Sequence, residues 1–122
     1  MRYFTAEEAN AALPRVAALV DRAREAAAEV QEQAEAVRER ARGNGEGPPA
    51  TAGAERLQQI ADELAADGIV LRDVDSGLLD FPARAEDGRE YWLCWRSGEE
   101  RVAWWHWPED GFAGRRPLGE AP

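Results

Sequence analysis

The sequence predicts an α+β protein in which a long antiparallel helical hairpin packs with a small antiparallel β-meander. A helical apolar period runs along residues 16–41, and a Gly/Pro-rich segment at 43–49 separates it from a shorter apolar period. Short apolar runs divided by turn signals follow and predict strands. With 122 residues, the chain is expected to form a single domain, with the helical hairpin at 5–67 and the β-meander and tail at 69–122.

The start of the first helix is marked by a capping box. The Thr5 hydroxyl can accept the backbone N–H of Glu8, and the Glu8 carboxylate can accept the N–H of Thr5, so the helix should begin at about Ala6. A proline clashes with the carbonyl four residues before it. We therefore expect Pro14 to interrupt the helix early, which leaves a short first helix and a long one over 14–42.

The long helix carries an apolar seam with heptad spacing and charged residues between the seam positions. The seam consists of Val16, Val20, Ala23, Ala27, Val30, Ala34, Val37 and Ala41. The second helix, at about 53–67, is roughly half as long, so it leaves part of the seam uncovered. Either the Gly/Pro-rich loop folds back over the seam, or a second copy covers it. A homodimer through a coiled coil is the expected answer, since an exposed apolar seam is costly; a plain two-helix scaffold is the alternative.

The expected strands are 69–71, 78–85, 89–96 and 101–107, with Asp-Gly as a hairpin turn signal. In the tightest hairpin register, Leu93 lies opposite Trp104, and Asp80 lies beside Trp95. Because side chains alternate between faces, one face is predicted to carry Asp80, Tyr91, Trp95, Trp104 and His106. The other face is predicted to carry Phe81, Trp92, Cys94, Ala103 and Trp105.

Composition excludes several classes of function. The net charge of −9 works against binding to nucleic acid or to an anionic membrane. The N-terminus does not resemble a signal peptide, and no run of about 20 apolar residues is present. A single Cys forms no intrachain disulfide. The expected location is therefore cytoplasmic.

The residues between Gly77 and Leu118 hold all five Trp, the only Cys and the only His. A thin sheet covered on one side cannot bury both sets of Trp, so one set is predicted to form a binding surface for a small molecule or a protein partner. Arg115 and Arg116 could form an anion pocket near His106; the alternative is that they pair with surface carboxylates. The candidate ligand-binding residues are Asp80, Tyr91, Trp95, Trp104, His106, Arg115 and Arg116.

Cys94 and His106 are also candidates for a metal or haem site, or for a Cys–His nucleophile pair. The predicted register places these two residues on opposite faces. The alternative is that Cys94 is a small buried hydrophobe and that His106 bonds to Asp80 or to a backbone carbonyl. No cofactor and no catalytic motif is assigned. The leading prediction is a binding or interaction module that uses the Trp-rich sheet face, and the second is a metal- or haem-binding protein or enzyme centred on Asp80, Cys94 and His106.

Four segments together resemble one family. These segments are FTAEEANAALPRV, GLLDFPA, LCWRSGE and WHWPEDGFAGRRPL. The sequence resembles the prokaryotic family DUF2203, a family of unassigned function, over nearly its whole length. The resemblance implies a self-contained domain and draws attention to these segments, and it implies no activity.

Overall fold

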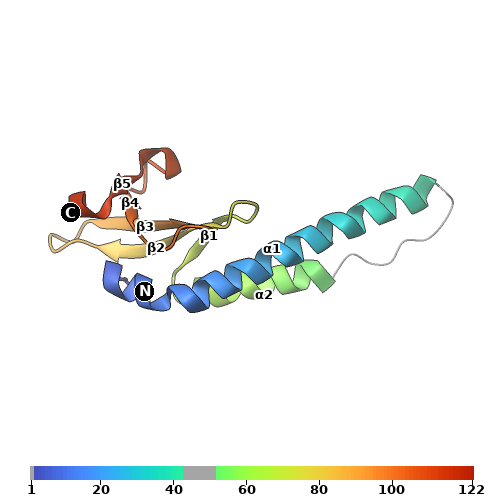
Figure 1. Ribbon diagram of the computed structural model, residues 1–122, viewed down its shortest axis with the longest axis horizontal. Coiled ribbons are helices and arrows are strands. Elements are labelled where there is room, and N and C mark those ends of the chain that lie inside the picture. Colours follow the sequence, from blue (N-terminus) through green and yellow to red (C-terminus); the bar gives the residue numbers. More distant parts are fainter. Residues whose placement is uncertain (1, 43–51) are drawn as a thin grey trace.

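The computed structural model describes residues 2–42 and 52–122. A long helix, α1 (Ala6–Arg42), runs beside a shorter helix, α2 (Ala52–Ala66), and an antiparallel sheet lies at one end of the pair (Figure 1). The predicted α+β fold is confirmed. The predicted Gly/Pro-rich turn lies outside the described residues.

The first helix begins where the capping box predicts. The N–H of Thr5 donates to the Glu8 carboxylate at 3.1 Å, and the N–H of Glu8 donates to the Thr5 hydroxyl at 3.0 Å. Just before the helix, Phe4 is buried edge-on against Phe81, and its N–H donates to the carbonyl of Pro82 at 2.7 Å. These contacts fix the start of α1 against the sheet.

The predicted interruption at Pro14 is wrong, because α1 continues through it as one helix of 37 residues. Pro14 itself is exposed, whereas Leu13 and Val16 on either side are buried in the core. One turn earlier, the Asn10 side chain bonds both backbone groups of Val102, with its Oδ1 accepting at 2.8 Å and its Nδ2 donating at 3.2 Å. Packing of an amphipathic face supplies most of a helix's stability, and here it outweighs the cost of about 3 kcal/mol for an internal proline.

The helix pair is packed closely where α2 begins. A Cβ placed on Gly53 would lie 3.0 Å from the carbonyl oxygen of Ala26 and 3.1 Å from the Val30 side chain. On the N-terminal side of this contact, the seam residues Val16, Val20 and Ala23 are buried. Beyond it, the described part of α1 extends past α2 (Figure 1), and seam residues such as Val37 are only partly buried.

The sheet is a meander in which each strand pairs with the next, in the order β1-β2-β3-β4-β5. Its strands are β1 (Val70–Asp73), β2 (Leu78–Arg84), β3 (Glu90–Arg96), β4 (Trp104–His106) and β5 (Arg116–Pro117). One face packs against the helices and forms the main core, with buried side chains that include Phe81, Leu93 and Trp105. Among the described helices, none combines the length and the apolar character that a bilayer span requires.

The predicted register is wrong by one residue in both hairpins. Leu93 pairs with Trp105 rather than Trp104, and Asp80 pairs with Cys94 rather than Trp95. In the first hairpin, the Ala85 N–H bonds the Arg89 carbonyl, so three residues form the loop instead of two. The last of them, Gly88, has φ 91°, which suits the left-handed position of such a loop.

The second hairpin has a longer connection than predicted. β4 begins only at Trp104, because both backbone groups of Val102 are bonded to the Asn10 side chain. A shift of one residue exchanges the two faces of a strand. Asp80 and His106 therefore stay together as predicted, with Trp104, but Cys94 joins them. Tyr91 and Trp95 move to the face that packs on the helices.

Candidate metal centre

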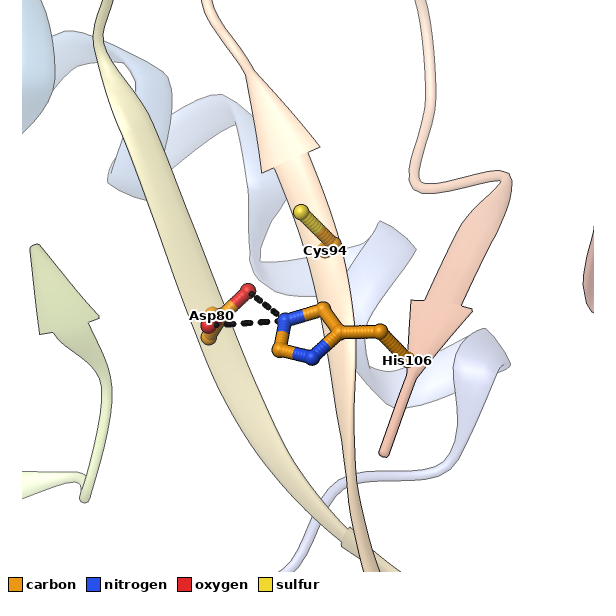
Figure 2. A group of neighbouring side chains, drawn as sticks. All are labelled: Asp80, Cys94 and His106. Carbon is orange, nitrogen blue, oxygen red and sulfur yellow. Dashed lines mark hydrogen bonds and ion pairs between the residues drawn. The ribbon is translucent and has the colours of Figure 1, made fainter. Parts of the chain in front are cut away.

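Three side chains with metal-ligating atoms meet on the sheet face that points away from the helices. Asp80 on β2, Cys94 on β3 and His106 on β4 lie on neighbouring strands, and Figure 2 shows the His106 ring directed at Asp80. One ligand atom from each residue lies within 4.8 Å of the other two. All three residues are at most 3% exposed. The metal-ligand candidates of the sequence thus converge, although the predicted register had separated them.

Both ring nitrogens of His106 face oxygen acceptors. Nδ1 lies 2.7 Å from the carbonyl oxygen of Trp107, and Nε2 lies 3.0 Å from each carboxylate oxygen of Asp80. Only the imidazolium can donate to both acceptors. Burial lowers the pKa of His106, but the hydrogen bonds, chiefly the one to Asp80, outweigh it and raise the pKa to about 10.

Asp80 is held by two cations. Its burial raises the pKa of the carboxyl group, but hydrogen bonds from His106 and Arg72 outweigh this and lower the pKa below its ordinary value. Arg72 Nε donates to Asp80 Oδ2 at 3.0 Å, and its guanidinium lies over the ring of Trp92, 4.9 Å from the ring centroid. Asp80 is therefore a buried carboxylate and not a neutral acid.

The arrangement does not suit a Cys–His nucleophile pair. Cys94 is a free, buried cysteine, and a general base must offer a lone pair to its thiol. His106 has both ring nitrogens directed at the oxygens of Asp80 and Trp107. His106 thus bonds to a carboxylate and to a backbone carbonyl, the two partners that the sequence analysis gave as the alternative to a metal site or a nucleophile pair.

A pocket of about 260 Å³ opens above the three residues. It is lined by Arg72, Leu78, Asp80, Cys94, His106, Pro108, Gly111 and Phe112. Among the described residues, Phe112 is the large hydrophobic residue that is exposed to solvent, at 42%. Gly111 has φ 62°, so the loop that forms this wall requires a residue tolerant of the left-handed region.

The two arginines of the tail do not converge on His106. Arg115 forms a bidentate pair with Glu99 at 2.6 and 3.0 Å, and it also donates to the carbonyl of Cys94 at 3.3 Å. Arg116 lies on β5, where its guanidinium covers the ring of Trp105 at 5.6 Å. Neither arginine lines the pocket. Arg115 matches the alternative in which the tail arginines pair with carboxylates.

Two other predicted site residues belong to the packed face of the sheet. Tyr91 meets Trp105 edge-on at 5.6 Å. Trp95 is buried, and its Nε1 donates to the carbonyl of Glu99 at 3.0 Å. The tryptophans that share a face with the metal-ligand candidates are Trp92 and Trp104.

Arg72 was missed by the sequence reasoning. It lies on an edge strand of four residues, VLRD, whose pairing with β2 contains an irregularity. The one signal in the sequence was a cation directly after the short apolar run 69–71, and such residues are usually solvated. Only the pairing of β1 with β2 brings Arg72 to Asp80.

Comparison with known proteins gives one match. The family model described as "Uncharacterized conserved protein (DUF2203)" matches residues 2–118. No curated protein and no solved structure matches the chain. The matched segment contains Asp80, Cys94 and His106 as well as every helix and strand of the fold apart from the last 3-10 turn. The chain belongs to the DUF2203 family.

Proposed function

We propose that Asp80, Cys94 and His106 bind one metal ion of the zinc type and leave a coordination position open to the pocket. The convergence of the three ligand atoms within 4.8 Å carries this proposal. Carboxylate, thiolate and imidazole are the side chains that bind Zn²⁺ in proteins, and catalytic zinc sites use three of them with a fourth position for water or substrate.

The surroundings of the three residues match those of a metal site. A metal-bound imidazole usually donates its other N–H to a carbonyl or a carboxylate, and His106 has Nδ1 against the carbonyl of Trp107, which directs Nε2 inward. A metal-bound carboxylate is usually hydrogen-bonded as well. Arg72 bonds Oδ2 of Asp80 and leaves Oδ1 for the metal. The ion would take the place of the Nε2 proton of His106 and the thiol proton of Cys94.

The open position defines the chemistry that the site offers. A bound zinc ion acidifies a water molecule or polarises a carbonyl oxygen, so the proposed activity is ligand binding or metal-assisted hydrolysis at the pocket. The proposed working surface is the sheet face that carries Asp80, Trp104 and His106, as predicted from the sequence; Trp92 and Cys94 lie on it as well, and Tyr91 and Trp95 do not.

A zinc titration of metal-free protein tests the proposal. We expect one zinc ion per chain and the release of about two protons at neutral pH, one from the thiol and one from the imidazolium. Loss of a partner outside the ligand set costs about 10–100-fold in metal affinity. Cys94→Ser and His106→Gln, which alter ligands, should weaken zinc binding by more than that.

Asp87→Asn is the matched control, because Asp87 is an exposed carboxylate in the β2–β3 loop, bonded to Arg89. It should bind zinc like the unaltered protein. Equal zinc binding by the unaltered protein and Cys94→Ser would reject the site.

We also propose that the chain forms a homodimer through a coiled coil at the far end of α1. The partly buried seam residues beyond α2, Ala34 and Val37, support this. Light scattering at micromolar concentration should give twice the 13.5 kDa chain mass. Val37→Glu should shift it to a monomer, whereas Arg38→Glu, at an exposed neighbouring position, should not. A 13.5 kDa species alone in the unaltered protein would contradict the dimer.

The proposed compartment is the cytoplasm. The only cysteine is free and buried, so the described fold needs no oxidising environment. The net charge of −9 supports partners other than nucleic acid and anionic membranes.

A further inference from the structure

We infer that the pocket above Asp80, Cys94 and His106 binds a small organic carboxylate, with its carboxylate group on Arg72 and its apolar body against Phe112. This inference names the ligand of the proposed metal centre, and it rests on that centre only for coordination at the open position. The recognition itself is argued from Arg72, from the charge at the pocket floor and from the apolar wall.

Arg72 is placed to receive an anion. Its Nε donates to Asp80 Oδ2 at 3.0 Å, and its guanidinium carbon lies over the Trp92 ring, 4.9 Å from the ring centroid. Within residues 2–42 and 52–122, its two Nη groups have no hydrogen-bond partner. The side chain is 43% exposed and lines the pocket. A guanidinium fixed on two sides with free N–H groups is preorganised for a carboxylate.

The floor of the pocket, which consists of Arg72, Asp80, Cys94 and His106, carries a net positive charge both without and with a bound metal ion. Without metal, the Asp80 carboxylate faces two cations, the His106 imidazolium and the Arg72 guanidinium. With a divalent ion, two anionic ligands, Asp80 and the Cys94 thiolate, neutralise the metal, and Arg72 remains. One anion would balance this charge in both cases, and a pocket that carries a net charge of one sign attracts a ligand of the opposite sign.

The neighbouring charges do not supply that anion. Glu99 is paired with Arg115 at 2.6 Å. Glu109 and Asp110 lie in the loop beside the pocket, but both are exposed and neither lines it. The described carboxylates beside the pocket therefore leave the Arg72 guanidinium open to an anion from solution.

The remaining wall favours a compact apolar body on the anion. Leu78, Pro108 and Phe112 line this side. Two guanidinium groups lie over the Phe112 ring, that of Arg115 at 4.8 Å and that of Arg96 at 5.4 Å from the ring centroid, and the residue stays 42% exposed. Pockets for drug-sized ligands start at about 300 Å³. A pocket of about 260 Å³ thus suits a carboxylate with one ring or a short branched chain.

Benzoate is the probe for the test, added to the full chain with and without zinc and followed by the NMR signals of the His106 ring and the Trp92 indole. We expect saturable binding that shifts these two signals, and tighter binding when zinc is present. Benzyl alcohol, which keeps the ring and lacks the charge, should not bind. Inorganic phosphate, which lacks the apolar body, should bind at least about 10-fold more weakly than benzoate.

The matched variants are Arg72→Gln and Arg89→Gln. Arg89 also pairs with an aspartate and lies over a tryptophan, Trp107 at 4.8 Å, but it lines no part of this pocket. Arg72→Gln should weaken benzoate by at least about 10-fold, as the loss of a charged hydrogen bond predicts, and Arg72→Lys should restore part of it. Arg89→Gln should change nothing.

The outcomes separate this inference from the metal centre. If the protein binds one zinc ion per chain but binds no benzoate, the carboxylate pocket is overturned and the metal centre stands. The same holds if benzoate binds equally well to the unaltered protein and to Arg72→Gln. Benzoate binding that depends on Arg72 in a protein that binds no zinc supports the pocket and removes the metal centre. Phosphate binding as tightly as benzoate overturns the choice of an organic carboxylate.

Discussion

Replacing Asp80 with alanine is expected to destabilise the metal-free protein by about 3–5 kcal/mol, the usual cost of removing one partner from a buried ion pair. The variant leaves the His106 imidazolium, which is 3% exposed, without its carboxylate, and it leaves Arg72 without its acceptor. Urea unfolding in the presence of a chelator measures the change. Asp87→Ala, which removes an exposed carboxylate, should stay within about 0.5 kcal/mol of the unaltered protein.

The unaltered protein and Asp80→Ala are also expected to differ in how their free energy of unfolding depends on pH. Because His106 has its pKa raised from 6.5 to about 10 on folding, its stabilising contribution is fully present below pH 6.5 and is lost as the pH rises through about 10. Asp80 has a lowered pKa, so its contribution is present above the ordinary Asp value and is lost as the pH falls below it. The difference in unfolding free energy between the unaltered protein and Asp80→Ala should therefore shrink from neutral pH to pH 10. A difference that grows over that interval would contradict the charged pair.

Gly77→Ala is expected to destabilise the protein by about 2–4 kcal/mol, because it combines backbone strain with a steric clash. Gly77 has φ 67°, and a Cβ there would lie 2.6 Å from Ser97 Cβ and 3.0 Å from Val20 Cγ1. The site is the contact between the end of the β2–β3 pair and α1, where neither neighbour is the free end of a long side chain.

Gly98→Ala separates the two causes. Gly98 also has a positive φ, 99°, but a Cβ there would meet nothing within 4 Å. It should cost only the conformational term of about 1–2 kcal/mol. Thermal unfolding of both variants measures the difference, and equal losses of stability would show that the contact with Ser97 and Val20 adds nothing.

Local signals in the sequence predicted the helices well. The capping box at Thr5 and Glu8 forms as expected, because it needs only the residues within one turn. The apolar period predicted the buried face around Val16, Val20 and Ala23, because a helix face depends on spacing alone. The predicted interruption at Pro14 was wrong because the cost of an internal proline is a local property of the helix. The burial of Leu13 and Val16 that offsets this cost depends on the whole core.

The candidate site was predicted only in part, because its geometry depends on register. The sequence selected Asp80, Cys94 and His106 by chemistry, since they include its only Cys and only His. It placed Cys94 on the wrong face because one additional residue in a loop exchanges the faces of a strand. Arg72 approaches Asp80 across strands, and no spacing along the chain predicts that contact.

The absorption spectrum of the cobalt(II)-substituted protein tests the metal centre most directly, because cobalt occupies zinc sites and reports its ligands. A site built from Asp80, Cys94 and His106 should give a thiolate-to-cobalt charge-transfer band and the intense visible bands of a four-coordinate ion. Cys94→Ser should lose the charge-transfer band, and Asp87→Asn should keep it. A spectrum of the unaltered protein that matches six-coordinate cobalt in water, with no charge-transfer band, would contradict the metal centre.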